Sequence, residues 1–456
     1  MGKLFGTDGI RGVANETLTC HLAYRVGQAA AISLGSTSGR RPRVVIGKDT
    51  RISSDMLEAA LLAGLTASGC DAIRLGVIPT PAVAYLTVQQ GADAGIVISA
   101  SHNPYEHNGI KMFSSKGFKL SDELEAEMEA LILQEGELPT KTHGEIGRIA
   151  DGAALAETYL AHLASTVEEI RPLRVVFDCA NGAASATAEK LFSRFPLQAK
   201  YLSVSPDGVN INEACGSTHL GRLCQAVREG GFDLGLAFDG DADRCFVIDE
   251  NGEPVTPSAV TALVAEREIA RAKAEGNEEP VIIYNLITSK AVPELVEKLG
   301  GRAVKTRVGH SFIKAVMAEE NGVFGGEHSA HYYFKDFFNA DTGMLAAMHV
   351  LAALGGGDQP LSEISAKYSP YVASGEINSE IEDKAAAVDR VRAHYANAPV
   401  VVEDSDGTTF TNTEEGWWVN LRPSNTEPFL RLNLEAPDVA TMERVRDEVL
   451  ALVRQG

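Results

Sequence analysis

The sequence is poor in basic residues for its length. It contains 41 lysine and arginine residues against 62 aspartate and glutamate residues, which gives a formal net charge of -21. Proteins that bind nucleic acids need a basic face for the phosphate backbone, so we expect no nucleic-acid partner. An anionic substrate would need a locally basic pocket within this acidic chain.

Paired cysteines and long apolar runs are also missing. No apolar run reaches the roughly 20 residues that a membrane-spanning helix requires, and the first residues lack the pattern of a secretory signal. We therefore expect a cytoplasmic protein without a membrane partner. The cysteines contain no CxxC pair, which indicates buried thiols in a reducing compartment and neither a disulfide framework nor a zinc site; they are Cys20, Cys70, Cys179, Cys215, Cys224 and Cys245.

A chain of 456 residues is too long for a single hydrophobic core. Helical and strand-like stretches alternate from the start, with a helix expected over residues 19–34 and a strand over 43–47, which predicts α/β domains. Asp55 and Glu58 have the spacing of a capping box for the next helix. Linker-like composition and turn residues divide the chain into four expected domains, at residues 1–150, 151–253, 254–367 and 368–456.

Residues 96–104 join an apolar, β-branched run to a polar loop. This pattern predicts a buried strand that delivers Ser101, His102 and an Asn-Pro turn into a cleft. Ser101 could act as a nucleophile, but neighbours along an extended loop point apart, so His102 is not required to be its base. Taken alone, such a loop is more often a plain turn than a functional site.

A second polar loop carries a carboxylate at every other position and ends in Arg244. Three carboxylates with this spacing can surround one hard cation. The alternatives are a solvated acidic turn and an EF-hand, although Arg244 stands where an EF-hand needs glycine and the flanking residues have strand character. The loop favours a catalytic Mg²⁺ site, and its carboxylates are Asp239, Asp241 and Asp243.

Two further loops have residues suited to binding phosphate. Residues 6–12 place Arg11 among three glycines, where the backbone can turn tightly and approach a ligand. Residues 422–426 combine Arg422 with hydroxyl and amide side chains that can cradle a phosphate together with backbone N–H groups. Either loop by itself could be a turn without a ligand.

Residues 326–331 place a carboxylate, a hydroxyl and an imidazole on one short loop, contributed by Glu327, Ser329 and His331. Such a set of donors and acceptors suits the vicinal hydroxyls of a hexose. Zinc ligation by His328 and His331 is the alternative, but no third or fourth ligand is evident nearby in the sequence.

The loop around Ser101 and the segments Asp239–Arg244, Gly326–His331 and Arg422–Thr426 resemble, in this order, the four signatures of the α-D-phosphohexomutases. Enzymes of that family interconvert hexose 1-phosphates and hexose 6-phosphates. The resemblance covers nearly the whole chain. It implies three similar α/β domains with mixed sheets and a smaller C-terminal α+β domain around a central cleft, although no internal repeat is visible in the sequence.

The resemblance also implies roles for individual residues. Ser101 would carry a phosphoryl group and, with the three aspartates of the second loop, would hold Mg²⁺. The remaining implied catalytic residues are Arg11, His102, Lys111 and Arg244; the implied sugar-binding residues are His310, Glu327, Ser329 and His331; the implied phosphate-binding residues are Arg422, Ser424, Asn425, Thr426 and Arg431.

The implied reaction runs through a phosphoserine and a hexose 1,6-bisphosphate that turns end for end in the cleft. Residues 6–15 and 210–219 resemble phosphoglucosamine mutases, whereas the chain from Asn285 onward resembles phosphomannomutase/phosphoglucomutases, with Ala330 in place of the usual glycine. Because the sugar loop lies in the second half, we expect mannose or glucose phosphates as substrates. Glucosamine phosphate is the alternative.

A non-catalytic phosphosugar-binding protein is an alternative of another class. The intact Ser101 and Lys111 and the three aspartates of the second loop argue against it. The expected partner is a small-molecule hexose phosphate, and the expected assembly is a monomer or a homodimer.

Overall fold

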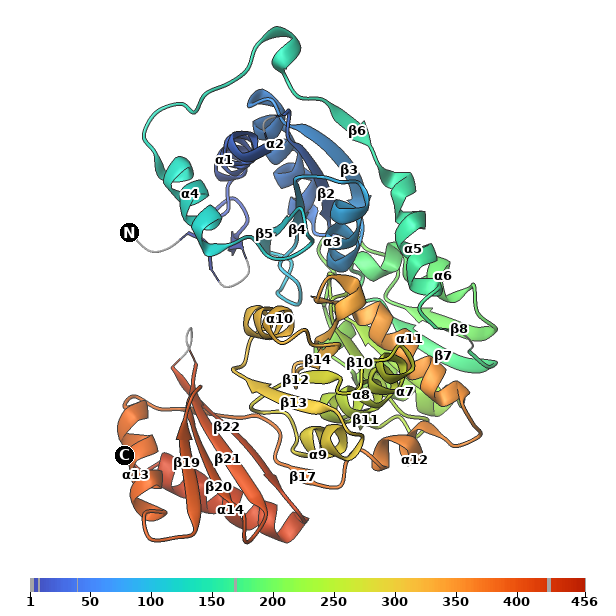
Figure 1. Ribbon diagram of the computed structural model, residues 1–456, viewed down its shortest axis with the longest axis vertical. Coiled ribbons are helices and arrows are strands. Elements are labelled where there is room, and N and C mark those ends of the chain that lie inside the picture. The colour runs from blue at the N-terminus through green and yellow to red at the C-terminus, as the bar shows by residue number, and fades with distance from the viewer. Residues whose placement is uncertain (1–3, 7–8, 39, 168–169, 425–427, 456) are drawn as a thin grey trace.

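The computed structural model describes residues 4–6, 9–38, 40–167, 170–424 and 428–455. Its strands form four sheets that follow one another along the chain (Figure 1). The first three sheets mix parallel and antiparallel strands and are interleaved with helices, and the fourth is antiparallel. The expected α/β class with a different C-terminal domain is confirmed. The domain limits at residues 150, 253 and 367 stay predictions.

The first sheet has the strand order β1-β5-β4-β2-β3-β6. Its buried central strands are rich in valine and isoleucine, as expected for strands covered on both faces. The elements are β1 (Ile10–Val13), α1 (Cys20–Ser38), β2 (Arg43–Lys48), α2 (Ile52–Ala67), β3 (Asp71–Val77), α3 (Thr80–Gln89), β4 (Ala94–Ile98), β5 (His107–Ser114), α4 (Asp122–Leu133) and β6 (Ile149–Asp151).

The second and third sheets have the orders β11-β10-β9-β7-β8 and β13-β12-β14-β15-β16. The second part of the chain contains α5 (Ala156–Ala164), β7 (Leu173–Asp178), α6 (Ala188–Phe192), β8 (Leu197–Leu202), α7 (Gly221–Gly230), β9 (Leu234–Phe238), β10 (Cys245–Ile248) and β11 (Pro254–Val255). The third contains α8 (Pro257–Ala274), β12 (Val281–Asn285), α9 (Ala291–Lys298), β13 (Arg302–Thr306), α10 (His310–Glu319), β14 (Phe324–Gly326), β15 (Tyr332–Phe334), β16 (Ala340–Asp341), α11 (Gly343–Gly355) and α12 (Leu361–Ala366).

These three sheets share one topology, although the sequence shows no repeat. In each, a first strand (β2, β7 or β12) pairs in parallel with the second and the third strand. The third strand then pairs antiparallel with a fourth (β5, β10 or β15). The similarity that the sequence resemblance implied is therefore present in the strand order.

The fourth sheet lies in the C-terminal part of the chain, drawn in red at the lower left of Figure 1. Helices α13 and α14 pack with it around a core of its own. Its elements are β17 (Val372–Ala373), β18 (Ile377–Glu380), α13 (Lys384–His394), β19 (Val400–Asp404), β20 (Thr408–Asn412), β21 (Trp417–Pro423), β22 (Phe429–Ala436) and α14 (Val439–Val453). By contrast, one large apolar core joins residues of the first three sheets, including Val45, Val175 and Phe324.

The predicted capping box at Asp55 and Glu58 is wrong. Helix α2 begins at Ile52, and its N-cap Arg51 makes no side-chain cap hydrogen bond. Asp55 and Glu58 instead both accept hydrogen bonds from the ammonium of Lys48, which is buried at the end of β2. A buried ammonium needs opposite charge close by, and this need outweighs the local capping pattern.

The six cysteines form no disulfide, and all but Cys20 are buried, in agreement with the sequence prediction. Within the described part of the chain, no helix combines the length and the apolar character needed to cross a membrane.

Candidate active site

Three of the predicted functional loops occupy the same place in their sheets. Ser101 lies between β4 and β5, the loop of residues 239–244 lies between β9 and β10, and the loop of residues 327–331 lies between β14 and β15. Each loop therefore follows the third strand of the shared topology and precedes its antiparallel partner. Strands β9 and β10 on either side of the acidic loop also rule out the EF-hand alternative, which needs helices.

Each of these loops contains a non-glycine residue with a left-handed backbone. The φ angles are 52° at Ser101, 58° at Ala242 and 64° at Ala330. This conformation costs a residue with a Cβ atom roughly 1 to 2 kcal/mol, so it persists only where the surrounding contacts hold it. At Ala330 the angle explains why glycine would suit this position.

The hydroxyl of Ser101 points at the acidic loop. It donates a hydrogen bond of 2.6 Å to Oδ2 of Asp239, and the residue is only 2% exposed. Nδ1 of His102 lies 3.3 Å from the same hydroxyl. The structure thus brings together the two loops that the sequence singled out first.

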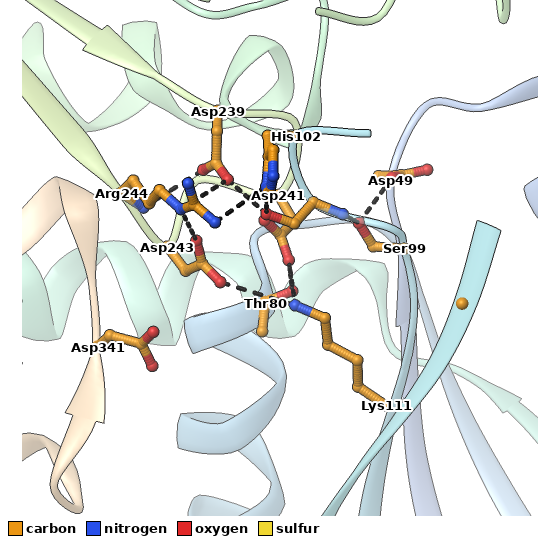
Figure 2. Close-up of polar contacts among 12 residues, drawn as sticks. Asp49, Thr80, Ser99, His102, Lys111, Asp239, Asp241, Asp243, Arg244 and Asp341 are labelled. Atoms are coloured by element: carbon orange, nitrogen blue, oxygen red, sulfur yellow. Dashed lines mark hydrogen bonds and ion pairs between the residues drawn. The ribbon is translucent and has the colours of Figure 1, made fainter. Parts of the chain in front are cut away.

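The carboxylates of Asp239, Asp241 and Asp243 are buried and offer oxygen atoms that all lie within 4.8 Å of one another. Burial and the charge of Asp241 raise the pKa of Asp239 to about 6. The same two causes raise the pKa of Asp243 well above its ordinary value. Figure 2 shows the three side chains directed toward a common region. Such crowded negative charge is costly unless a cation compensates it.

A second observation supports a divalent metal ion at the acidic loop. Oδ1 of Asp243 is buried and accepts no hydrogen bond from any described residue, so it has an open coordination position. Oxygen-only ligands are the set that Mg²⁺ and Ca²⁺ prefer. The three aspartates could therefore hold such an ion next to the Ser101 hydroxyl.

Asp241 is fixed by contacts with the first domain. Its Oδ2 accepts hydrogen bonds from the hydroxyl of Thr80 at 2.6 Å and from the ammonium of Lys111 at 3.0 Å. The backbone N–H of Thr80, the first residue of α3, donates to the Asp241 carbonyl. Lys111, on β5, also lies 3.7 Å from Oδ2 of Asp243. These contacts lock the acidic loop against the domain that carries Ser101.

Arg244 connects the serine loop with the sugar loop. Its Nη2 donates to Nδ1 of His102 at 2.9 Å, and its Nε donates to Nε2 of His331 at 3.1 Å. Burial and the charges of Arg244 and Arg11 lower the pKa of His102 to about 3. At neutral pH His102 is therefore an uncharged acceptor whose Nδ1 is already engaged by a guanidinium.

A cavity of about 60 Å³ opens at this point, and cations and anions both line it. Arg11 is exposed at its wall, so the predicted locally basic pocket exists within the acidic protein. The lining residues are Arg11, Thr80, Ser101, Lys111, Phe113, Asp243, Arg244, Lys314, His331 and Asp341.

The sugar loop is rigidly held. Glu327 is 1% exposed and accepts hydrogen bonds from the Tyr333 hydroxyl at 2.6 Å and the Gly309 N–H at 3.0 Å. Burial acts to raise the pKa of Glu327, but hydrogen bonds from His331, Tyr333 and Gly309 outweigh it and bring the pKa to about 2. Ser329 Oγ lies 2.9 Å from Nδ1 of His331. A sugar hydroxyl would have to join or replace these bonds to reach Glu327.

Asp243, His331 and Asp341 form a second group whose atoms could hold a metal ion. Asp341 is already paired with the Lys314 ammonium at 2.7 Å, and Nε2 of His331 accepts from Arg244. The aspartate triad is the better site for Mg²⁺, because it offers oxygen ligands only, whereas this second group includes an imidazole whose Nε2 is already engaged. His328 belongs to neither group of metal-ligating atoms found among the described residues, which argues against the zinc alternative.

The phosphate loop lies on the fourth domain and forms a separate group. Arg422 on β21 and Arg431 on β22 face each other across the two strands, and each lies within 4 Å of Glu376. The buried Nε of Arg422 donates to no described residue, which leaves a donor for an anion. Ser424 follows β21, whereas Asn425 and Thr426 lie outside the described residues. His310 begins α10, and its side chain also lies outside the description.

Sequence reasoning missed several residues that build this site. Thr80, Lys314 and Asp341 line the cavity. Thr80 begins α3, Lys314 lies within α10 and Asp341 ends β16, and none of them belongs to a recognisable sequence motif. Asp49 and Arg51 could have been found, because they follow the parallel strand β2, whose neighbour β4 leads to Ser101. Polar residues after adjacent parallel strands gather at one edge of a sheet.

Comparison with known protein families agrees with this geometry. Models described as phosphoglucomutase/phosphomannomutase alpha/beta/alpha domains I, II and III match residues 2–138, 157–252 and 256–371. The model of the phosphoglucomutase/phosphomannomutase C-terminal domain matches residues 376–452. The chain therefore belongs to the α-D-phosphohexomutase family and is a phosphohexomutase, an intramolecular phosphotransferase.

Individual relatives cover the chain from end to end. A phosphoglucosamine mutase from Brevibacillus brevis is 40% identical over 461 residues, which span 100% of this chain and 99% of that protein. A phosphoglucosamine mutase from Acetivibrio thermocellus is 38% identical, with 100% and 99% covered. A phosphoglucomutase/phosphomannomutase family protein from Burkholderia thailandensis, 26% identical, has a TM-score of 0.85, with 99% and 97% of the two chains covered.

Proposed function

We propose that this phosphohexomutase acts on an amino sugar and interconverts glucosamine 6-phosphate and glucosamine 1-phosphate. The observation that carries the proposal is the 40% identity with a phosphoglucosamine mutase over the whole chain, the third domain included. The expectation of mannose or glucose phosphates rested on the similarity of the second half to phosphomannomutase/phosphoglucomutases, and the relatives give it no specific support.

Ser101 is the proposed phosphoryl carrier. Its buried hydroxyl lies beside the acidic loop at 2.6 Å from Asp239, which is the position a metal-assisted acceptor needs. In the first transfer, a sugar hydroxyl oxygen attacks the phosphorus of phosphorylated Ser101, the bond from phosphorus to Oγ breaks, and Oγ takes up the proton that the sugar hydroxyl loses. In the reverse transfer, Oγ loses this proton and attacks the phosphorus of the sugar phosphate, the bond from phosphorus to the sugar oxygen breaks, and that oxygen takes up a proton. Asp239, Asp241 and Asp243 would hold Mg²⁺, which when bound neutralises charge on the transferring phosphoryl group.

The cationic side chains have distinct proposed roles. Arg11 and Arg244 line the cavity and stabilise negative charge on the transferring group. Lys111 exchanges the proton of the serine hydroxyl or stabilises the serine oxygen by its charge, because it lies in the same cavity between Asp241 and Asp243. His102 stays uncharged, and Arg244 holds its Nδ1 at 3.3 Å from the hydroxyl oxygen of Ser101, beside the transferring group.

The 1-position and the 6-position of the sugar must each come next to Ser101 during one reaction cycle. A hexose 1,6-bisphosphate formed in the first transfer has to turn end for end, so the sugar loop recognises hydroxyls in two orientations. His310, Glu327, Ser329 and His331 are the proposed sugar-binding residues. Arg422, Ser424, Asn425, Thr426 and Arg431 would bind whichever phosphate is not reacting, and Nε of Arg422 is available for it.

The substrate assignment is tested by comparing three sugars. α-Glucosamine 1-phosphate, α-glucose 1-phosphate and α-mannose 1-phosphate are each incubated with the protein, Mg²⁺ and a trace of the matching 1,6-bisphosphate, and 6-phosphate formation is measured. We expect kcat/KM for the amino sugar to exceed the other two by about tenfold or more. A preference for glucose or mannose phosphate would reject the amino-sugar assignment but leave the mutase class intact.

A further inference from the structure

A fully buried guanidinium lies directly beneath the serine loop. Arg51 follows strand β2, and its side chain is 0% exposed. An arginine has five N–H donors, and here all five have acceptors. Its Nε donates to Asp49 at 2.9 Å, and its two terminal nitrogens donate to the backbone carbonyls of Ser101 at 2.8 Å, Asn103 at 2.9 Å, His107 at 3.1 Å and Pro104. One side chain therefore binds three carbonyl groups of the loop that contains Ser101 and the carbonyl of the first residue of β5.

Asp49 extends this network to the other side of Ser101. Its carboxylate accepts hydrogen bonds from Arg51, from the Ser54 hydroxyl at 2.9 Å and from the Ser99 hydroxyl at 2.7 Å. The oxygen of Ser99 in turn accepts the backbone N–H of Ser101 at 3.0 Å. Figure 2 shows Asp49 and Ser99 joined beside the acidic loop. The same ion pair thus fixes both the N–H and the carbonyl of Ser101.

The second domain reaches the same carbonyl group. Nδ2 of Asn212 donates to the Ser101 carbonyl at 3.0 Å and to the Asn103 carbonyl at 3.3 Å. Gly240, between two of the metal-loop aspartates, packs against this point: a Cβ atom there would lie 2.5 Å from the Ser101 oxygen and 2.9 Å from Nδ2 of Asn212. The serine loop and the acidic loop of residues 239–244 therefore meet at the Ser101 carbonyl.

Ser101 depends on such support because its backbone is left-handed, with φ of 52°. Without external hydrogen bonds the residue would relax toward the ordinary regions of the backbone map. A rotation there would swing the hydroxyl away from Asp239, and displacement of a reacting group by about 1 Å can cost on the order of a hundredfold in rate.

We propose that Arg51 and Asn212 are positioning residues for phosphoryl transfer, which hold the Ser101 carbonyl from two domains and so fix the Ser101 hydroxyl against the metal loop. Neither side chain needs to touch the substrate. The inference rests on the proposed role of Ser101 as phosphoryl carrier, and it holds for whichever hexose phosphate the enzyme accepts.

The test compares two variants with a matched control. Arg51→Lys keeps the positive charge but offers three donors in place of five. Asn212→Gly removes the amide and tolerates the left-handed backbone at this residue, where φ is 59°. The control is Arg25→Lys in the same domain, because Arg25 also binds four backbone carbonyls, those of Leu131, Ile132, Gln134 and Gly136, around the end of α4.

For each variant the melting temperature, kcat, KM and the ratio of phosphoenzyme hydrolysis to transfer are measured. We expect Arg51→Lys and Asn212→Gly to lower kcat about tenfold or more with little change in KM, and to raise the hydrolysis ratio, because the phosphoserine is no longer held in line. Arg25→Lys should lower the melting temperature while kcat and the hydrolysis ratio stay at the wild-type values.

The proposal is overturned if Asn212→Gly and folded Arg51→Lys both keep the wild-type kcat and hydrolysis ratio. It is also overturned if Arg25→Lys loses as much kcat as these two variants. If Arg51→Lys does not fold, Asn212→Gly alone decides. Ser101→Ala run in parallel separates the two levels of inference: an active Ser101→Ala enzyme rejects the phosphoserine route itself, whereas an inactive one beside fully active positioning variants rejects only the positioning role.

Discussion

The hydroxyl of Ser101 lies 2.6 Å from a carboxylate oxygen of Asp239, although 138 positions separate the two residues in the chain. This contact joins the end of strand β4 in the first sheet to the loop after β9 in the second. The oxygen proposed to carry the phosphoryl group and the loop proposed to bind the cation are thus adjacent in the folded chain. Phosphoryl transfer requires this adjacency, because positioning and charge neutralisation supply most of its catalysis.

Replacing Ser101 by alanine should abolish transfer without abolishing binding. We expect Ser101→Ala to lose at least about a hundredfold in kcat, because alanine has no oxygen that could carry the phosphoryl group. Arg422 and Arg431, which are proposed to bind phosphate, are unchanged in this variant. A sugar phosphate should therefore still bind, as measured by calorimetric titration. Near-normal turnover would exclude the phosphoserine route.

Removing one carboxylate from the acidic loop of residues 239–244 should change Mg²⁺ affinity and thermal stability in opposite directions. Asp243→Asn should weaken Mg²⁺ binding about tenfold or more, since a carboxylate ligand is lost. In metal-free buffer the same variant should melt at a higher temperature than the wild type, because two neighbouring buried carboxylates no longer repel it. Titration calorimetry and thermal melts with and without chelator measure both effects.

Glu253→Gln is a matched control for that experiment. Glu253 belongs to an exposed ion pair with Arg228 in the same domain, and such pairs contribute little to stability. Neither its melting temperature nor its Mg²⁺ affinity should change. If Asp243→Asn melted at a lower temperature than the wild type in metal-free buffer, repulsion among the three aspartates would not destabilise the protein.

The residues proposed to bind the non-reacting phosphate, around Arg422 on the fourth domain, should contribute to substrate binding. Arg422→Ala should raise KM about tenfold or more, because a hydrogen bond to a charged group contributes about 1.5 to 3 kcal/mol. Arg392→Ala serves as the control, since Arg392 forms a surface pair with Asp404 in the same domain. Steady-state kinetics measure the effect, and an unchanged KM for Arg422→Ala would remove Arg422 from the binding site.

His349 should make the protein sensitive to acid. It stacks on Phe334 and faces Glu268, Arg267 and Arg271 of α8, and burial together with the two arginines lowers its pKa to about 3. The unfolded chain therefore binds a proton near pH 6.5 that the folded protein excludes, so stability is present above that pH and falls as the pH drops below it. The loss between pH 7 and pH 5 should be about 2 kcal/mol.

His349→Phe tests this effect, because phenylalanine keeps the stack on Phe334 but cannot be protonated. The raised pKa of the neighbouring Glu268 is common to both proteins and cancels in the comparison. Melting temperatures at pH 7, 6 and 5 should fall less for His349→Phe than for the wild type. Parallel curves would show that His349 does not couple to unfolding.

Local chemistry explains why the loops of the candidate site could be located without a structure, whereas their proposed roles came from the family resemblance. The strand before Ser101 and the strands around the acidic loop follow from apolar, β-branched runs that end in polar turns, and these patterns depend only on neighbours in sequence. The same reasoning failed at Asp55 and Glu58, where a capping pattern was present but the buried Lys48 used both carboxylates. A long-range electrostatic need overrode a short-range preference there.

The sequence itself therefore determined the α/β class and the order of chemically distinct loops along the chain, with their carboxylate, guanidinium and hydroxyl side chains. Tertiary structure decided which of them meet. The repeated strand order places three loops at equivalent positions, and a shared apolar core presses those positions together. The contacts of Ser101 with Asp239, and of Arg51 and Asn212 with the Ser101 carbonyl, arise because packing between sheets joins residues that local patterns treat separately.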